Sequence, residues 1–309
     1  MKILYLSDTY AQTVHGTKIS IFNEMKKRGF SITFQEIHSA GRNKINGKEL
    51  LKTLHKEKYT DLWISHTWCT YIGCTLQDIN KLGVKVLGFG FSDPYAFKGA
   101  KLKMYNVYST NHLATYNKLN KKFPMIYTPT ACDTHFHKDL GLERPTDILI
   151  YGVGTHPRFK PNTYRLTMAK KLLQQFKKFN IKIFGRKWQS IPHKPPILGN
   201  VFLNEINKAK VSIDLQQDWA PLAHRMFECM ACGTPVLTRN RPEVRAMLPT
   251  DNEILVYDDY KSLATQTSKL LKNSKFRTDI RKSMYENTRK NHNITNRIDQ
   301  LLSTLTEKA

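Results

Sequence analysis

The sequence predicts an α/β protein built from two doubly wound domains with parallel sheets. The chain opens with an apolar run over 2–7, an amphipathic stretch over 19–29 and an alternating run over 30–37, which is the strand–helix–strand order of such a domain. A second apolar run over 147–153 starts another series of strands and helices. The length of 309 residues suffices for two domains, and 40% hydrophobic residues allow packed cores.

The net charge is the most unusual property of the composition. There are 49 Lys and Arg residues against 25 Asp and Glu, which gives +24, and both halves of the chain are basic. Such a field favours a polyanionic partner, which could be nucleic acid, an anionic membrane surface or an acidic polymer. A lysine-rich surface without such a partner is the alternative interpretation.

The cysteines and the hydropathy argue against a disulfide-rich secreted protein and against a membrane-spanning protein. Five cysteines form no disulfide framework, and the first residues predict a strand rather than a secretory signal. No apolar run reaches the length of about 20 residues that a membrane-spanning helix needs. Cys229 and Cys232 have no second cysteine pair or histidine cluster beside them to hold a metal. We therefore expect a cytoplasmic protein without an integral membrane segment or a bound metal.

The stretch from His224 to Thr238 carries the strongest functional signal. It predicts a helix, a Gly-Thr-Pro turn and a short buried strand. Arg225 and Glu228 are spaced i, i+3, so they share one face of that helix. The first backbone N–H groups of the helix and Arg225 suit a phosphate, and Glu228 suits sugar hydroxyls. A surface ion pair followed by an ordinary helix–strand loop is the alternative.

The run Arg-x-Phe-Glu-x-Met-Ala-Cys-Gly-Thr-Pro-Val-Leu resembles the donor-site motif of retaining GT-B glycosyltransferases, in glycosyltransferase family 4 and its CgeB-like group. The resemblance implies sugar transfer from a nucleoside diphosphate donor, with UDP as the expected nucleotide and no required cofactor or metal. In that family the glutamate at the position of Glu228 holds the ribose hydroxyls. A second family glutamate falls on Ala220, so donor-sugar recognition stays open, and Asp218 nearby is the expected contact.

The resemblance also implies an arrangement of domains. It places an acceptor-side Rossmann-like domain over 1–140 and a nucleotide-sugar domain over 141–290, which face each other across a cleft. The remaining stretch, 291–309, is expected to be a helix that crosses back to the first domain. Its apolar residues are Ile294, Ile298, Leu301, Leu302 and Leu305.

The first domain contributes three further candidates by position. Gly16 lies in the loop after the first strand, where GT-B enzymes approach the donor. His66 ends the strand over 61–66 and is expected at the donor-sugar pocket, with Arg225 and Asp93 completing the catalytic set. Asp93 precedes Pro94 in a segment that resembles the Asp-Pro signature of the CgeB-like group. An ordinary turn, a structural histidine and an Asx-turn are the alternatives.

The second domain contributes the expected donor contacts. Gly154 ends a Gly-x-Gly turn after the strand over 147–153, and Arg158 or Lys160 in the next loop is expected at the diphosphate. Arg186 and Trp188 follow the strand over 181–185, where family members pack beside the nucleotide base. A core position for Trp188 is the alternative.

Three functions remain open, two of them enzymatic and one a binding function. The net charge favours DNA, with transfer to a hydroxymethylated pyrimidine base that is flipped out of the duplex. Transfer to a cell-envelope polymer, a glycolipid or a protein is the second, with the charge serving an anionic surface. A non-catalytic nucleic-acid-binding module with the same fold is the third, and Ala220 in place of a carboxylate is its best support.

Overall fold

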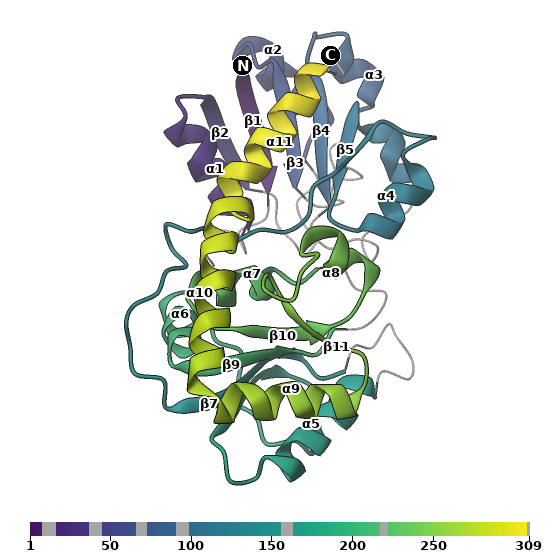
Figure 1. Cartoon of the computed structure of the whole chain (residues 1–309). Coiled ribbons are helices and arrows are strands. Elements are labelled where there is room, and N and C mark those ends of the chain that lie inside the picture. Colours follow the sequence, from purple (N-terminus) through teal and green to yellow (C-terminus); the bar gives the residue numbers. More distant parts are fainter. Residues whose placement is uncertain are drawn as a thin grey trace. The chain divides into compact units, whose positions relative to one another are not determined.

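The structure is a computed structural model that describes residues 1–7, 17–36, 45–65, 73–90, 99–155, 163–216 and 222–307 (Figure 1). The chain divides into two compact units. The first unit comprises Met1–Asp133 with Ile294–Ala309, and the second comprises Thr134–Asn293. The described residues form one parallel sheet in each unit, as the sequence predicts.

The sheet of the first unit has the strand order β2-β1-β3-β4-β5-β6 and is parallel throughout. Its strands are β1 (Lys2–Ser7), β2 (Ser31–Glu36), β3 (Asp61–Ser65), β4 (Lys85–Gly90), β5 (Val107–Thr110) and β6 (Met125–Tyr127). Its helices are α1 (Thr17–Lys27), α2 (Gly47–Lys56), α3 (Leu76–Asn80), the 3-10 helix Gly99–Met104, α4 (Leu113–Leu119) and α11 (Ile294–Glu307).

Successive residues of β1 pack into two different hydrophobic clusters. Leu4 and Leu6 join one cluster, which includes Leu50 of α2, whereas Ile3 and Tyr5 join another. The two faces of the strand are both buried because side chains alternate along a strand and helices cover both faces of a parallel sheet. This explains why β1 is continuously apolar in sequence.

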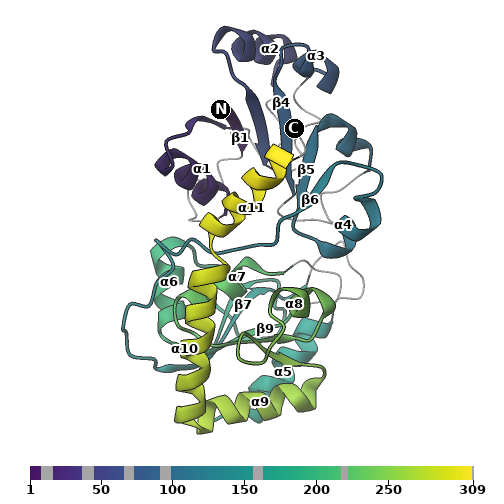
Figure 2. The same ribbon diagram turned by 45° about the horizontal axis from the view of Figure 1, so that its top comes forward.

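The last helix belongs to the first unit, which confirms the prediction that it crosses back. Ile294, Ile298 and Leu301 of α11 are buried in the same cluster as Ile3 and Tyr5 of β1. On the polar side, Arg28 at the end of α1 donates to Asp299 Oδ1 at 2.6 Å. Figure 2 shows α11 running beside α1. The apolar spacing seen in the sequence is therefore the packing face of this helix.

The sheet of the second unit has the order β11-β10-β9-β7-β8 and is also parallel. Its strands are β7 (Thr146–Val153), β8 (Ile181–Arg186), β9 (Ala209–Asp214), β10 (Val236–Arg239) and β11 (Leu255–Tyr257). Its helices are α5 (Tyr164–Gln175), α6 (Gly199–Asn207), α7 (His224–Ala231), α8 (Pro242–Met247), α9 (Tyr260–Lys272) and α10 (Ser274–Asn291). Helices α5 and α9 lie on one side of this sheet and α7 on the other (Figure 1).

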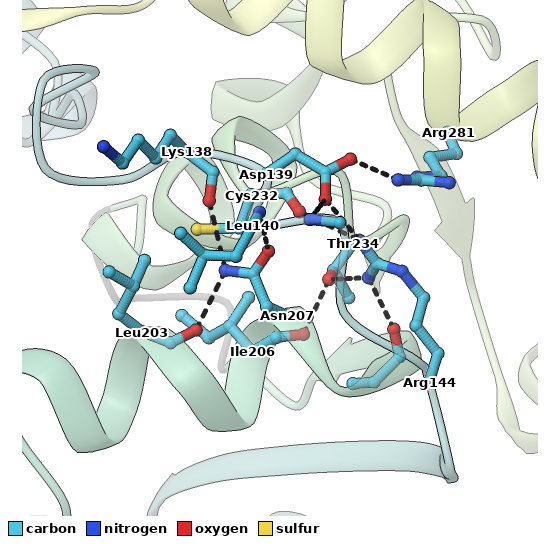
Figure 3. A network of polar contacts seen from close by, with 12 residues as sticks. Lys138, Asp139, Leu140, Arg144, Leu203, Ile206, Asn207, Cys232, Thr234 and Arg281 are labelled. Atoms are coloured by element: carbon cyan, nitrogen blue, oxygen red, sulfur yellow. Dashed lines mark hydrogen bonds and ion pairs between the residues drawn. The ribbon is translucent and has the colours of Figure 1, made fainter.

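The segment 134–140 belongs to the second unit, although the sequence places the boundary after residue 140. The buried side chain of Asn207 accepts a hydrogen bond from the backbone N–H of Leu140 (2.8 Å) and donates to the carbonyl of Lys138 (3.1 Å). Asp139 pairs with Arg281 of α10 and with Arg144 (Figure 3). These polar contacts fasten the segment to α6 and α10, and hydropathy alone does not reveal them.

Candidate functional site

The ends of β7, β8 and β9 and the start of α7 form the region in which the sequence predicts a ligand. In open parallel sheets, ligands bind beyond the carboxyl ends of the strands. Arg225 and Glu228 of α7 are partly exposed, whereas Met226, Phe227 and Cys229 between and beside them are buried. The i, i+3 spacing therefore places both charged residues on the open face of the helix.

The N-terminus of α7 adds backbone donors to this region. Ala223 occupies the N-cap position and has no side-chain oxygen to cap the first-turn N–H groups. These groups and the positive end of the helix dipole favour an anion. Arg225 in the same turn supplies a guanidinium, which suits the bidentate binding of phosphate.

Arg225 reaches the end of β7. Its guanidinium lies over the ring of Tyr151 at 5.0 Å, and the Tyr151 hydroxyl donates to the carbonyl of Ile197 at 2.8 Å, which fixes the ring. A methyl group placed on Gly152 would lie 3.6 Å from Arg225 Nη2 and 4.0 Å from Arg165 Nη1. Two guanidinium groups therefore approach the same residue at the end of this strand, which creates a local positive charge.

Sequence reasoning missed Arg165, the second residue of α5. Its Nε donates to the carbonyl of Leu215 (2.8 Å) and its Nη1 to the carbonyl of Val153 (2.7 Å). The side chain thus ties the end of β7 to the end of β9. The sequence feature that could have identified Arg165 is its place in the first turn of the helix that follows the Gly-x-Gly strand end.

Glu228 is the carboxylate on the open face of α7. Its side chain is 13% exposed, and Oε1 lies 4.0 Å from Nε2 of His137, whose side chain is 3% exposed. His137 lies in the segment that the sequence treats as a linker. No motif pointed to it, because its proximity to Glu228 depends on how that segment folds back onto the second unit.

Gly154 is required by close packing between two turns. A methyl group there would lie 2.6 Å from the carbonyl oxygen of Lys187 and 2.8 Å from Cα of Trp188. Its backbone N–H donates to the carbonyl of Arg186 at 2.9 Å. This N–H group is therefore used within the fold, and the glycine serves the approach of the β7 and β8 turns.

The expectation that Trp188 stacks on a nucleotide base is corrected by the structure. Trp188 is 1% exposed, and its indole N–H donates to the carbonyl of Gly152 at 3.1 Å. The indole fills the core between the ends of β7 and β8, so it offers no free face to a ligand. Arg186, which ends β8, is exposed, and its role beside the base stays a prediction.

The other expected site residues lie outside the described residues, and their roles stay predictions. They are Gly16, His66, Asp93, Arg158, Lys160 and Asp218. Two of the segments concerned, 156–162 and 217–221, follow closely after β7 and β9, the strands whose ends Arg165 joins.

The cysteine beside Glu228 is held in its neutral form. Burial raises the pKa of the Cys229 thiol to about 12, and the hydrogen bond to Ser212 opposes this only in part. Within the described ranges, no group of three or more His, Cys, Asp and Glu residues is arranged to hold a metal ion. None of the described helices is both long enough and apolar enough to cross a membrane.

Comparison with known proteins assigns this region to a class. Residues 165–303 match the family model described as "Glycosyl transferase-like". No curated protein matches the chain significantly in sequence. The match covers α5, β9, α7 and the turn after α7, which include Arg165, Arg225 and Glu228.

Solved structures with the same fold cover nearly the whole chain. A glycosyltransferase from Rickettsia africae ESF-5 is 11% identical, with a TM-score of 0.74 and coverage of 99% of this chain and 98% of that chain. Anabaena Alr3699/HepE in complex with UDP and glucose is 11% identical, with a TM-score of 0.70 and 99% of both chains covered. Sucrose-phosphate synthase from Thermosynechococcus elongatus is 13% identical, with a TM-score of 0.64 and 100% of both chains covered.

The sequence match and the sheet topology agree with each other. The matched range contains the motif that the sequence singles out, and it includes four of the five strands of the second unit's parallel sheet. The chain therefore has the GT-B fold of these glycosyltransferases, and residues 165–303 are similar to the glycosyl transferase-like family.

Proposed function

We propose that the enzyme takes a sugar from a UDP-sugar and transfers it to a hydroxymethylated pyrimidine base in DNA. The observation that carries the donor half is the joint placement of Arg225 and Glu228 on the open face of α7. Arg225 faces the diphosphate and Glu228 the ribose hydroxyls. The UDP and glucose bound to Anabaena HepE, which has this fold, support UDP as the nucleotide.

The chemistry follows from where charge develops. The bond between the sugar C1 and the diphosphate oxygen breaks, the acceptor hydroxyl oxygen bonds to C1, and the hydroxyl proton passes to the departing diphosphate. Negative charge grows on the departing UDP, where Arg225 and the first N–H groups of α7 stabilise it. Retention of the anomeric configuration is the outcome that the motif favours.

The acceptor half rests on the net charge of +24. A polyanion is attracted by such a charge, and each phosphate that the protein neutralises releases condensed counterions. Double-stranded DNA carries one negative charge per about 1.7 Å of helix axis, which suits a protein of this charge. A target base inside a duplex must be flipped out to reach the donor.

Transfer of a labelled sugar tests both halves. The enzyme is supplied with UDP-sugars and with hydroxymethylated or unmodified duplex, over a salt titration. We expect transfer to the modified duplex alone. If about six phosphates are contacted, DNA affinity falls on the order of a thousandfold between about 50 and 200 mM salt.

Each alternative gives a different result in this assay. Transfer to neither duplex, with transfer to a cell-envelope extract, replaces DNA by an envelope acceptor. DNA binding without any cleavage of a panel of UDP-sugars supports a non-catalytic nucleic-acid-binding module. Cleavage of another nucleotide sugar in place of UDP-sugars removes UDP from the proposal and leaves glycosyl transfer intact.

A further inference from the structure

The buried imidazole of His137 faces the carboxylate of Glu228, and we propose that His137 is a positioning residue for nucleotide binding. It holds Oε1 of Glu228 from the protein side, so that the carboxylate keeps a fixed orientation and its other oxygen meets the ribose hydroxyls. The inference rests on the proposed function of Glu228. It adds a residue from the segment 134–140, at the start of the second unit.

The backbone around His137 is fixed on both sides. Arg289 of α10 donates through Nη1 to the carbonyl oxygens of Thr134 (3.2 Å) and His137 (3.5 Å). On the other side, Asn207 of α6 binds the carbonyl of Lys138 and the N–H of Leu140. These contacts hold the backbone of His137 in a fixed position within the second unit.

The side chain of His137 is equally constrained. It is 3% exposed, and the ring of Phe136 packs edge-on against it with centroids 5.0 Å apart. Its Nε2 lies 4.0 Å from Oε1 of Glu228, which is longer than a direct hydrogen bond. This separation suits an electrostatic attraction between the ring nitrogen and the carboxylate.

Glu228 needs such a neighbour because it is largely withdrawn from water. A carboxylate that is 13% exposed has lost much of its hydration, and a donor nearby compensates for that loss. Recognition of two vicinal hydroxyls also requires the carboxylate plane to be fixed. Fixing it before the ligand arrives lowers the cost of ordering the side chain on binding.

The test is a double-mutant cycle on UDP affinity, measured by calorimetry. We expect His137→Leu, which keeps the volume and removes the donor, to weaken UDP binding about tenfold, or about 1.4 kcal/mol. His137→Gln, which returns an N–H donor, should restore part of that loss. In a Glu228→Ala background the same His137→Leu change should alter UDP affinity less than about twofold, since the two residues act as a unit.

A control variant and a kinetic measurement separate a positioning role of His137 from a general contribution to folding stability. The exposed His135 in the same segment provides a matched control, and His135→Gln should leave UDP affinity unchanged. When the donor concentration is varied, His137→Gln should raise the KM for the UDP-sugar while kcat stays within about twofold, as expected for lost uniform binding. Thermal unfolding identifies a variant that fails to fold, and the cycle can then be completed with His137→Gln.

The outcomes separate the role of Glu228 in nucleotide binding from the role of His137. Unchanged UDP affinity in folded Glu228→Ala overturns the proposed role of Glu228, and the inference falls with it. A strong effect of Glu228→Ala, combined with a His137→Leu effect that is absent or fully additive, overturns the inference alone. Coupling between the two substitutions, with partial rescue by glutamine, supports it.

Discussion

Gly185→Ala should destabilise the second unit and also weaken nucleotide binding. A methyl group at Gly185 would lie 1.6 Å from the carbonyl oxygen of Gly152 and 2.7 Å from its carbonyl carbon. Both are backbone atoms, so no side chain can turn away to make room. The ends of β7 and β8 would have to separate, although they pair at this position.

The size of the effect can be worked out from the interactions lost. Gly185 has φ +140°, a conformation that costs an alanine about 1–3 kcal/mol. Moving Gly152 also breaks the hydrogen bond from Trp188 Nε1 to its carbonyl, and a buried polar group left without its partner costs about 1–3 kcal/mol. The sum is about 2–6 kcal/mol in the free energy of unfolding.

Gly199→Ala is the matched control within the same unit. Gly199 has φ +57°, but no atom lies within 4 Å of the position that its methyl group would take. It should therefore cost only about 1–2 kcal/mol, the conformational part. Urea unfolding measures both variants, and calorimetry measures UDP affinity, which should fall for Gly185→Ala alone because Arg225 packs against Gly152. Equal destabilisation by the two substitutions would refute the argument from close backbone packing.

Three further predictions concern the motif and the segment beside it. Arg225→Ala should lower kcat roughly a hundredfold and UDP affinity much less, since the diphosphate gains charge as it leaves; steady-state kinetics that show an unchanged kcat would contradict this. Asn207→Leu should cost about 2–4 kcal/mol in urea unfolding, because Leu140 and Lys138 lose their buried partner, and a loss below about 1 kcal/mol would argue against the anchoring. The thiol of Cys229, with a pKa of about 12, stays protonated and buried at about pH 8; alkylation mapped by mass spectrometry should label it only after unfolding, and labelling of the folded enzyme would count against it.

Local patterns in the sequence determined the fold class and the central motif. Apolar runs such as β1 and β7 predict buried parallel strands because a strand buried on both faces has no polar side. The spacing of Arg225 and Glu228 predicts a shared helical face, and the exposure pattern of α7 agrees with it. The packing of the last helix was equally predictable from its apolar spacing.

The tertiary structure alone decided which distant residues share the site. His137 lies near Glu228 because Asn207 and Arg289 anchor the segment before β7. Trp188 lies in the core because its indole N–H finds the carbonyl of Gly152 on the neighbouring strand. Hydropathy and spacing report on residues close in sequence, whereas these contacts join separate elements. They depend on the packing of whole strands and helices, which no single stretch of the sequence specifies.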